Sequence, residues 1–481
     1  MVEHYGENTL WLYWEGPKPE WIRICEDLLH LHNPTAVTLS PEGLLELGFP
    51  ANVWQAIQHW HVAQRSDAIR FWLLHRFGGM WCDIDCIPMR SFANFITLAK
   101  HALAGVSAYD STDKTVGCGF IAARPNAPPI KEMWHIIETT ALSGKVPQWL
   151  EVSTWPLTEI VKRHGRENFL LWPLNHISPI SWRDSARFLE RGTEEEHDRL
   201  FRGFPAAWCW MLCHHKLREL GLNDWTRHEL LYGTCLLSYV LRQSYEAARP
   251  STITPRGRAV ATLNVHNDGL CHTFRESMRH AAQRWGAEFV EIRTPIVPWV
   301  DPYWEKVNLD RHLAMYERVV YLDRDVVVRS DCPNLFSLVP EDTFGVVPSE
   351  QPGHELVDIH IRPNLEHMIA LLQIEFNYTT DYFNSGVMVF SPKRHRHVFA
   401  LARDLHPIPW KRNWVTCDQG LLSLALKLLD VPITRLPPEF NRCGDKLWNH
   451  WNPIMDDYVW HFCGPKTWEK MANTIWKVTL R

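Results

Sequence analysis

The amino-acid sequence predicts an α/β protein made of two tandem domains, and three observations support this. Each half of the 481-residue chain reads as alternating strands and helices, which is typical of a mostly parallel sheet covered by helices. A strand ending in Asp-x-Asp occurs around Trp81–Cys86 and again around Val319–Val326, about half the chain further on. Between the halves, "AARPSTITPRGR" is rich in Pro, Ser, Thr and Arg, as domain linkers are. We therefore expect domains at 1–248 and 259–481, joined by a linker at 249–258.

Composition and charge exclude several classes of protein. Hydrophobic residues make up 46% and charged residues 22%, the balance of a folded globular chain. The formal net charge of -5 gives no basic field, which disfavours a nucleic-acid partner held by its phosphates. The start of the chain has no apolar signal-peptide run, and the apolar stretch Leu230–Leu241 is too short to span a bilayer. We expect a cytoplasmic protein without a transmembrane segment, while peripheral membrane contact and the oligomeric state stay open.

Cysteine usage points the same way. The 12 cysteines are scattered without a tight framework, which favours a reduced compartment. One Cys/His cluster, Cys209, Cys213, His214 and His215, matches no common zinc spacing. We expect it to hold buried thiols on a helix.

The segment "QRSDAIRFWLLHRFGGMWCDIDC", residues 64–86, predicts a helix followed by a short strand. Its apolar residues fall at helical spacing, and Gly78 and Gly79 supply the stop that helix ends favour. Asp67 and Arg70 are three residues apart and so share one face of the helix. The strand then carries two carboxylates that alternate along it and point to the same side.

These residue types suit the handling of a sugar diphosphate. Asp83 and Asp85 at a strand end can hold a hard divalent cation, which neutralises the charge of a departing pyrophosphate. Asp67 can accept hydrogen bonds from sugar hydroxyls, and Arg70 can donate a fork to sugar or phosphate. Taken singly, an Asp-x-Asp is often a solvated strand end and an Asp–Arg pair a helix ion pair. Their joint order before and after the Gly-Gly turn favours a site.

The segment resembles the Asp-x-Asp sugar-binding family that includes capsular polysaccharide synthesis proteins, yeast-type initiating mannosyltransferases and the glucosylating domains of large clostridial toxins. Three further stretches agree with it: "LWLYWEGPKPEW" from Leu10, "GCGFIAARPNAPPI" from Gly117 and "TWPLTEIV" from Thr154. The resemblance covers about residues 10–158. It implies a GT-A fold with a Rossmann-like nucleotide-binding sheet, and transfer with retention at the anomeric carbon.

The resemblance also implies roles for individual residues. Trp14 is expected beside the nucleobase, Asp67 and Arg70 at the sugar, and Asp83 and Asp85 at the nucleotide and metal, with Asp67 counted among the catalytic candidates. Members of the family often carry a closing Ser-Trp segment near the C-terminal end. Its nearest counterpart here, "AAWCWMLCHH" from Ala206, departs from that pattern.

The second Asp-x-Asp lies in "KVNLDRHLAMYERVVYLDRDVVVRSDCPNLFSL", residues 306–338. Val319–Leu322 is a β-branched and aromatic run typical of a buried parallel strand, and it ends in Asp323 and Asp325. Four more motifs follow in order: "DYFNSGVMVFSP" from Asp381, "CDQGLLSLAL" from Cys417, "LPPEFN" from Leu436 and "HFCGPKTW" from His461.

This series resembles the glycogenin-like and lipopolysaccharide-galactosyltransferase family of retaining enzymes, over about residues 259–468. The resemblance implies that Asp323, Asp325 and His461 hold the metal, and an imidazole beside two carboxylates suits manganese better than calcium. It assigns the remaining sites as follows: Asn384 and Asp418 to sugar or acceptor, Gln419 to the β-face of the anomeric carbon, Gly464 and Lys466 to the pyrophosphate, and Leu263, Lys306 and Ser385 to the nucleotide sugar. Asp418 and Gln419 are the catalytic candidates. Singly, His461 could be a core histidine and Asp418 a helix N-cap.

We therefore expect a bifunctional retaining glycosyltransferase that moves hexoses to a growing glycan, with one metal-dependent site per domain. The expected cofactors are Mn²⁺ or Mg²⁺ and a UDP-hexose donor, with GDP-mannose as the alternative donor for the first domain. Two other hypotheses stay open. One is a single active domain joined to a degenerate carbohydrate-binding or scaffolding domain. The other is an enzyme that glycosylates a protein or a modified nucleic-acid base.

Overall fold

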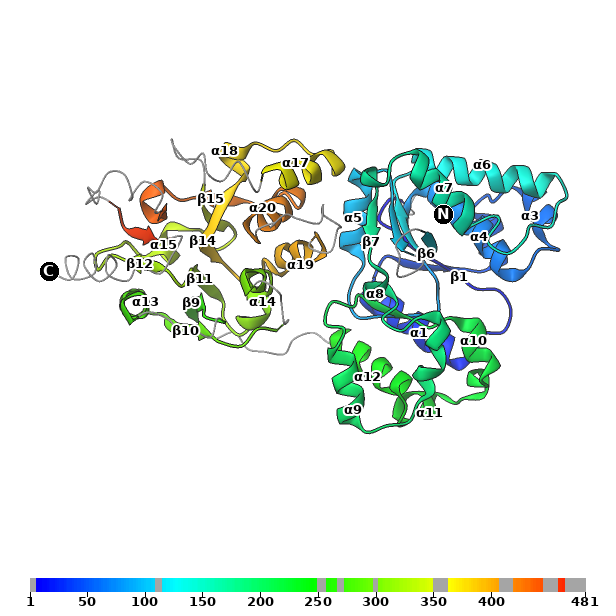
Figure 1. The fold of residues 1–481 in the computed structure, drawn as a ribbon, viewed down its shortest axis with the longest axis horizontal. Helices are drawn as coiled ribbons and strands as arrows, with labels where there is room; N and C mark the ends of the chain where they lie inside the picture. The colour runs from blue at the N-terminus through cyan, green and yellow to red at the C-terminus, as the bar shows by residue number, and fades with distance from the viewer. Residues whose placement is uncertain are drawn as a thin grey trace. The chain divides into compact units, whose positions relative to one another are not determined.

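The computed structural model forms two compact units, the first built mainly from Met1–Pro250 and the second mainly from the residues after it (Figure 1). It describes residues 6–108, 115–248, 257–265, 272–296, 302–348, 362–405, 418–443 and 457–462. Most of the predicted linker, 249–256, lies outside these residues, so the predicted domain bounds stay a prediction. No helix in the described ranges is both long enough and apolar enough to cross a membrane.

The first unit is built on a six-stranded sheet. Its strands are β1 (Leu10–Tyr13), β2 (Ala36–Leu39), β3 (Gly79–Cys82), β5 (Gly105–Ala108), β6 (Val116–Ala123) and β7 (Leu170–Trp172), in the order β2-β1-β3-β6-β5-β7. The strands β2, β1 and β3 run parallel to one another, β6 is antiparallel to both of its neighbours, and β7 is parallel to β5.

Helices connect these strands and extend the unit beyond the sheet. They are α1 (Glu20–His32), α2 (Pro41–Glu46), α3 (Ala51–Ile57), α4 (Val62–Phe77), α5 (Ala93–His101), α6 (Pro128–Leu142), α7 (Thr154–Arg163), α8 (Leu174–Ile177), α9 (Glu194–Arg202), α10 (His214–Glu219), α11 (Arg227–Tyr232) and α12 (Leu236–Ala248), with 3₁₀ turns at Arg166–Asn168, Trp182–Leu189 and Leu222–Asp224.

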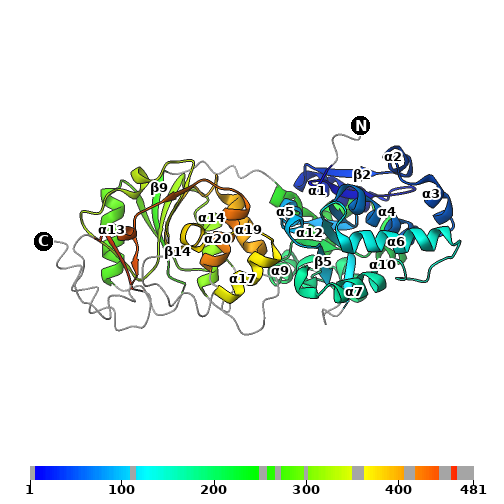
Figure 2. The same ribbon diagram turned by 90° about the horizontal axis from the view of Figure 1, so that it is seen from above.

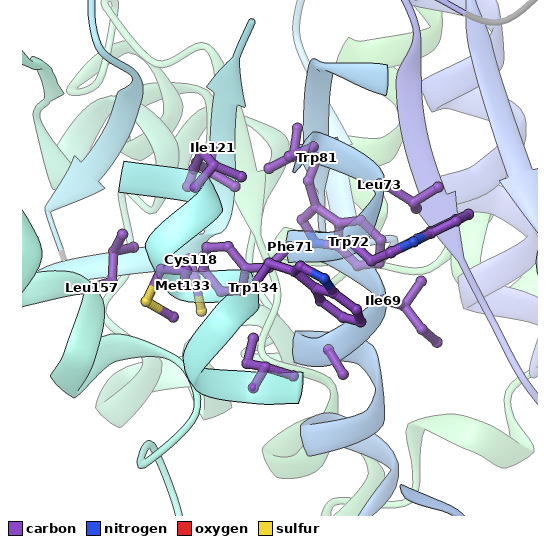
Figure 3. Packing of buried hydrophobic residues seen from close by; sticks show 14 of the residues in the cluster. Ile69, Phe71, Trp72, Leu73, Trp81, Cys118, Ile121, Met133, Trp134 and Leu157 are labelled. Atoms are coloured by element: carbon purple, nitrogen blue, oxygen red, sulfur yellow. The ribbon is translucent and has the colours of Figure 1, made fainter. Parts of the chain in front are cut away.

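Alternate residues of each strand face opposite sides of this sheet, and both faces are buried. Trp81 and Ile121 pack with α4, α6 and α7 in one cluster, in which Trp72 and Trp134 are among the largest side chains (Figure 3). On the other face, Phe120 lies against aromatic rings that include Phe95 on α5. A sheet covered on both sides explains why its strands are apolar without alternation.

Helix α4 carries the first predicted motif and is fixed at both ends. A capping box begins it: His61 accepts from the Ala63 amide at 3.2 Å, and Gln64 accepts from the His61 amide at 3.1 Å. Gly78 ends it with φ 68°, in the left-handed region that glycine adopts at little cost. A Cβ on Gly79 would lie 2.4 Å from the Thr9 carbonyl oxygen, so the close approach of helix end and sheet requires this glycine. The predicted helix stop is confirmed.

The second unit repeats the architecture. Its strands are β9 (Arg258–Leu263), β10 (Glu288–Ile292), β11 (Arg318–Leu322), β13 (Phe344–Pro348), β14 (Phe383–Phe390) and β15 (Ile433–Arg435), in the order β10-β9-β11-β14-β13-β15. Strands β10, β9 and β11 are parallel, β14 is antiparallel to both neighbours, and β15 is parallel to β13. Counted along the chain, strand order and direction are the same in the two sheets.

Helices cover both faces here as well. They are α13 (His272–Arg284), α14 (Leu309–His312), α15 (Leu335–Leu338), α17 (Arg362–Leu371), α18 (Tyr378–Asp381), α19 (Arg396–Leu405) and α20 (Asp418–Leu428), with 3₁₀ turns at Pro302–Asn308 and Pro438–Phe440. Val320 and Val389 pack with α13 and α15, and Phe344 and Phe390 pack against Phe399 of α19 on the other face. Figure 2 shows α13 on one side of the sheet and α19 and α20 on the other.

A small antiparallel ribbon leaves each sheet at the same point. In the first unit β4 (Cys86–Pro88) pairs with β8 (Cys209–Met211), and in the second β12 (Val326–Val328) pairs with β17 (Val459–His461), which also pairs in parallel with β16 (Arg442–Cys443). Both ribbons begin directly after an Asp-x-Asp. The expected fold class, α/β with two tandem GT-A (Rossmann-like) domains, is confirmed by this duplicated topology.

One local prediction was wrong. Cys209 lies in strand β8 and Cys213 lies just before α10, so the Cys/His cluster is not a run of thiols on one helix. Pairing with β4 selects the strand, because it places Met211 opposite Cys86 and fills the backbone hydrogen bonds of both segments. A three-residue apolar run does not reveal such a distant partner.

Candidate active sites

In the second unit, two carboxylates and an imidazole meet at the end of β11. Asp323 and Asp325 follow that strand, and β17 brings His461 opposite Val326. The His461 Nε2 lies 3.5 Å from Asp323 Oδ2 and 3.2 Å from Asp325 Oδ1. One ligand atom from each residue lies within 4.8 Å of the others, the one group of three such side chains in the described part of the chain. Two oxygens and one nitrogen in this arrangement fit a divalent transition metal such as Mn²⁺.

The orientation of the His461 imidazole is set by Asn441, which contacts the ring nitrogen that does not face the carboxylates. Asn441 Oδ1 lies 3.1 Å from His461 Nδ1, and Asn441 Nδ2 donates to Asn384 Oδ1 at 3.0 Å. An acceptor at Nδ1 selects the tautomer that carries its proton there and leaves the Nε2 lone pair facing the carboxylates. Asn441 ends the "LPPEFN" motif, but the sequence alone gave it no role. The structure identifies it as a positioning residue, and its place in an ordered motif was the available signal.

This arrangement predicts the effect of replacing Asn441. Asn441→Leu removes the acceptor behind Nδ1, and the loss of such a partner typically weakens metal binding about 10–100-fold. Asn441→Asp keeps an acceptor oxygen in place and should retain most of the affinity. Mn²⁺ titration followed by electron paramagnetic resonance (EPR) measures both variants. Unchanged affinity in the leucine variant would show that Asn441 does not orient the ring.

A buried lysine bridges the same carboxylates. Lys306 Nζ lies 2.8 Å from both oxygens of Asp323, 3.0 Å from Ser385 Oγ and 3.4 Å from Asp418 Oδ2, while Ser385 donates to Asp418 at 2.5 Å. Burial lowers the pKa of Lys306, but Asp323 and Asp418 outweigh burial and raise it. Burial would raise the pKa of Asp323, yet Lys306 and His461 hold it well below its usual range. Burial raises the pKa of Asp418. The ammonium therefore stays charged, and so does the carboxylate of Asp323.

The other predicted residues of this site are partly accounted for. Gln419 is buried beside Asp418 at the start of α20, and its side-chain amide donates to the Tyr382 hydroxyl at 2.5 Å. Asn384 and Ser385 lie in β14 next to β11, and Leu263 ends β9. Gly464 and Lys466 lie outside the described residues. The structure thus gathers Lys306, Asp323, Asp325, Asn384, Ser385, Asp418 and His461 into one connected group, while their roles stay predictions.

The first unit has a related arrangement at the end of β3. Arg70 Nη2 lies 2.8 Å from Asp83 Oδ1, and Arg70 Nη1 lies 3.2 Å from Asp67 Oδ1. Trp81 Nε1 donates to the same Asp83 oxygen at 2.8 Å. Burial, followed by the nearby charge of Asp83, raises the pKa of Asp85 to about 6, and burial raises the pKa of Asp67 to about 6. Arg70 therefore connects Asp67, its predicted helical partner, to the first aspartate of the Asp-x-Asp.

Segments far along the chain complete this first site. The His214 amide donates to Asp85 Oδ2 at 2.7 Å. Trp14, just after β1, lies edge-on to the His214 ring at 5.4 Å between centroids, and Trp21 stacks on that ring at 5.5 Å. Trp14 is therefore brought beside the segment that holds Asp85, while its expected role beside the nucleobase stays a prediction. The strand predicted around Trp81–Cys86 ends earlier, at Cys82, and the two aspartates lie in the connection to β4.

The two sites share one design built partly from different segments. In each, a buried cation joins the first Asp of the Asp-x-Asp to another carboxylate: Arg70 joins Asp83 to Asp67, and Lys306 joins Asp323 to Asp418. Asp67 comes from α4, before the central strand, whereas Asp418 comes from α20, long after it. In both units an aromatic side chain, two residues before the first Asp, donates a hydrogen bond to that aspartate. Tyr321 donates to Asp323 at 2.7 Å, and Trp81 donates to Asp83 at 2.8 Å.

Comparisons with known proteins agree with this pattern. Residues 303–472 match the family "Glycosyl transferase family 8". Residues 38–102 match the family "Glycosyltransferase sugar-binding region containing DXD motif". No curated protein matches the chain.

Solved structures of glycosyltransferases resemble about half of the chain. A glycosyltransferase involved in the glycosylation of the major capsid of PBCV-1 is 12% identical, with a TM-score of 0.32 over 46% of this chain and 100% of its own. The galactosyltransferase LgtC is 13% identical, with a TM-score of 0.30 over 46% and 96%. Mouse xyloside xylosyltransferase 1 is 12% identical, with a TM-score of 0.29 over 44% and 98%. These scores are low and add nothing to the topology above.

The family matches confirm both resemblances seen in the sequence. The sugar-binding match contains Asp83 and Asp85, and the family 8 match contains Asp323, Asp325 and His461. Together the two matches support a glycosyltransferase. The chain is thus similar to a DXD-containing glycosyltransferase sugar-binding region in its first unit and to glycosyl transferase family 8 in its second.

Proposed function

We propose that the protein is a bifunctional retaining glycosyltransferase, which transfers hexoses from nucleotide sugars to a growing glycan at one metal-dependent site per unit. The observation that carries the proposal is the duplication: an Asp-x-Asp follows the third strand of two sheets with the same order and direction. In each unit a buried cation lies against the first of these aspartates. A single such site could be incidental, but the same arrangement twice supports two sites of the same chemistry.

The residues of the second site suit a donor diphosphate bound through a cation. Asp323, Asp325 and His461 would hold Mn²⁺ or Mg²⁺, which when bound neutralises the pyrophosphate and so stabilises the leaving group. Asp418, fixed by Ser385 and Lys306, can accept hydrogen bonds from sugar hydroxyls. In the first site Asp83 and Asp85 would hold the cation, and Asp67 would take the sugar. A UDP-hexose is the proposed donor, with GDP-mannose as the alternative in the first unit.

The retaining outcome is proposed without a covalent intermediate. Gln419 lies at the position that the family resemblance places near the anomeric carbon, and an amide is a poor nucleophile. Its bond to Tyr382 would hold it as a dipole beside the sugar. The acceptor hydroxyl would then attack on the face from which the phosphate departs, and the phosphate oxygen would take its proton. A glycosyl-enzyme adduct detected by mass spectrometry would contradict this route.

One observation favours a second candidate. The first unit has Met211 at the strand position where the second unit has His461, which suits a first unit that binds carbohydrate without transferring it. Separate replacement of one aspartate per site decides between the two functions.

Asp85→Asn and Asp325→Asn are each expected to abolish one transfer step and leave the other. Each change removes a ligand of the cation, whose charge stabilisation is worth several kcal/mol, so the affected step should slow by about 10³-fold. Donor hydrolysis and transfer are measured across UDP- and GDP-sugars, with and without chelator. If Asp85→Asn leaves every activity intact, the first unit is a binding or scaffolding module. If neither change affects any activity, the proposed function is wrong.

A further inference from the structure

We infer that the two sites bind divalent cations unequally: the second binds Mn²⁺ without nucleotide, whereas the first binds it only together with a nucleoside diphosphate. The inference rests on the proposed function, and it starts from strand register. Met211 lies opposite Cys86, the residue after Asp85, and His461 lies opposite Val326, the residue after Asp325. The next residue of each strand donates its amide to the second aspartate's carbonyl, both at 2.9 Å.

The two side chains also enter the same space. In each unit a glycine of the neighbouring strand accepts from the amide of the first aspartate, Gly119 from Asp83 at 2.8 Å and Gly386 from Asp323 at 2.9 Å. A Cβ built on Gly386 would lie 2.2 Å from Cε1 of His461. A Cβ built on Gly119 would lie 3.4 Å from Sδ of Met211 and 2.5 Å from Asp83 Oδ2. The thioether of the first site therefore stands where the second site has its imidazole.

This exchange removes a ligand that hard cations accept. A thioether is soft and selects metals such as Cu(I), whereas carboxylate and imidazole suit Mn²⁺. Within the described residues, no third His, Cys, Asp or Glu joins Asp83 and Asp85 in a metal-ligand group. His214 gives Asp85 its backbone amide, and its ring lies against Trp21 and Trp14. The first site thus offers two carboxylates, one of which also bonds Arg70 and Trp81.

A cation held by two carboxylates needs further oxygen ligands, and substrate phosphates are the usual source of them. The first site should therefore gain its cation when a diphosphate arrives. The second site, with three protein ligands and an oriented imidazole, should hold Mn²⁺ beforehand. Losing even an indirect partner of a metal costs about 10–100-fold in affinity, so a lost direct ligand should cost at least that much.

The test is a Mn²⁺ titration of the full chain, in which EPR follows the free ion. We expect one site per chain without nucleotide, lost in Asp325→Asn and retained in Asp85→Asn. Addition of UDP or GDP should create a second site, which Asp85→Asn removes. Two sites of similar affinity without nucleotide would overturn the inference and leave the proposed function standing. The inference would also be overturned if the chain bound one Mn²⁺ without nucleotide and UDP or GDP added no second Mn²⁺ site.

A gain-of-ligand variant sharpens the test. Met211→His restores the arrangement of the second unit and should create a second nucleotide-independent site that binds at least about tenfold more tightly than the wild-type first site. Met211→Leu, the matched control, should create none. Circular dichroism of each variant checks that it is folded. If the wild type binds no Mn²⁺ with or without UDP and GDP, metal-dependent transfer itself fails, which is a different result from two equal sites.

Discussion

Gly386→Ala is expected to abolish the metal site of the second unit while the first unit keeps its own. The new methyl group would lie 2.2 Å from Cε1 and 2.4 Å from Nδ1 of His461. Moving the ring away would break its contact with Asn441. Both residues are buried, so neither side chain has free space to move into. We expect at least about a 10–100-fold loss of Mn²⁺ affinity, since losing even an indirect partner of a metal costs that much. Mn²⁺ EPR and donor hydrolysis measure it.

Gly119→Ala is the matched control in the first unit. There the new methyl group would meet the end of the Asp83 side chain, at 2.5 Å from Oδ2. This carboxylate is 34% exposed and can swing toward solvent, so the change should weaken the first site without destroying it. Equal losses in the two variants, or normal Mn²⁺ binding by Gly386→Ala, would show that the imidazole does not occupy the place described.

Lys306→Met is expected to destabilise the second unit strongly, apart from any effect on catalysis. The change leaves Asp323 and Asp418 buried without their cation, and breaking a buried ion pair on one side typically costs about 3–5 kcal/mol. Hydrogen–deuterium exchange of the β11 and β14 amides measures the free energy of unfolding of this unit directly. The amides of β1 and β3 in the first unit should keep wild-type protection.

Two variants control for the charge of Lys306. Lys306→Arg keeps the positive charge and should cost less than the methionine variant. Arg70→Met removes the corresponding cation of the first unit, where Asp83 is 34% exposed against 17% for Asp323, so water should offset more of the loss. If Lys306→Met leaves the protection of β11 unchanged, the lysine does not stabilise the carboxylates.

Much of the fold was predictable, because its information is local. The buried strand 319–322, the Gly78–Gly79 stop and the Asp67–Arg70 pair each follow from neighbouring residues, and the structure has all three. The second site was predictable for a different reason: its ordered motifs named Asp323, Asp325, Asp418 and His461 before their contacts were known.

What was missed depends on contacts between distant segments. Strand β8 pairs with β4 across more than a hundred residues, and three apolar residues do not predict that partner. The role of Asn441 likewise depends on its contact with His461, which no spacing shows. The placement of Met211 at the position of His461 depends on the registers of the two ribbons, which no local pattern predicts.

The β4–β8 ribbon also sets the shortest fragment of the first unit that can be expressed with its aspartates supported. The sugar-binding match ends at residue 102, but Asp85 takes a hydrogen bond from His214. Beyond it, Ser244 of α12 hydrogen-bonds the Pro88 carbonyl at the end of β4. A recombinant fragment cut where the family likeness fades would lose these supports under its aspartates. The first half is therefore best expressed through Ala248, with its last helix intact.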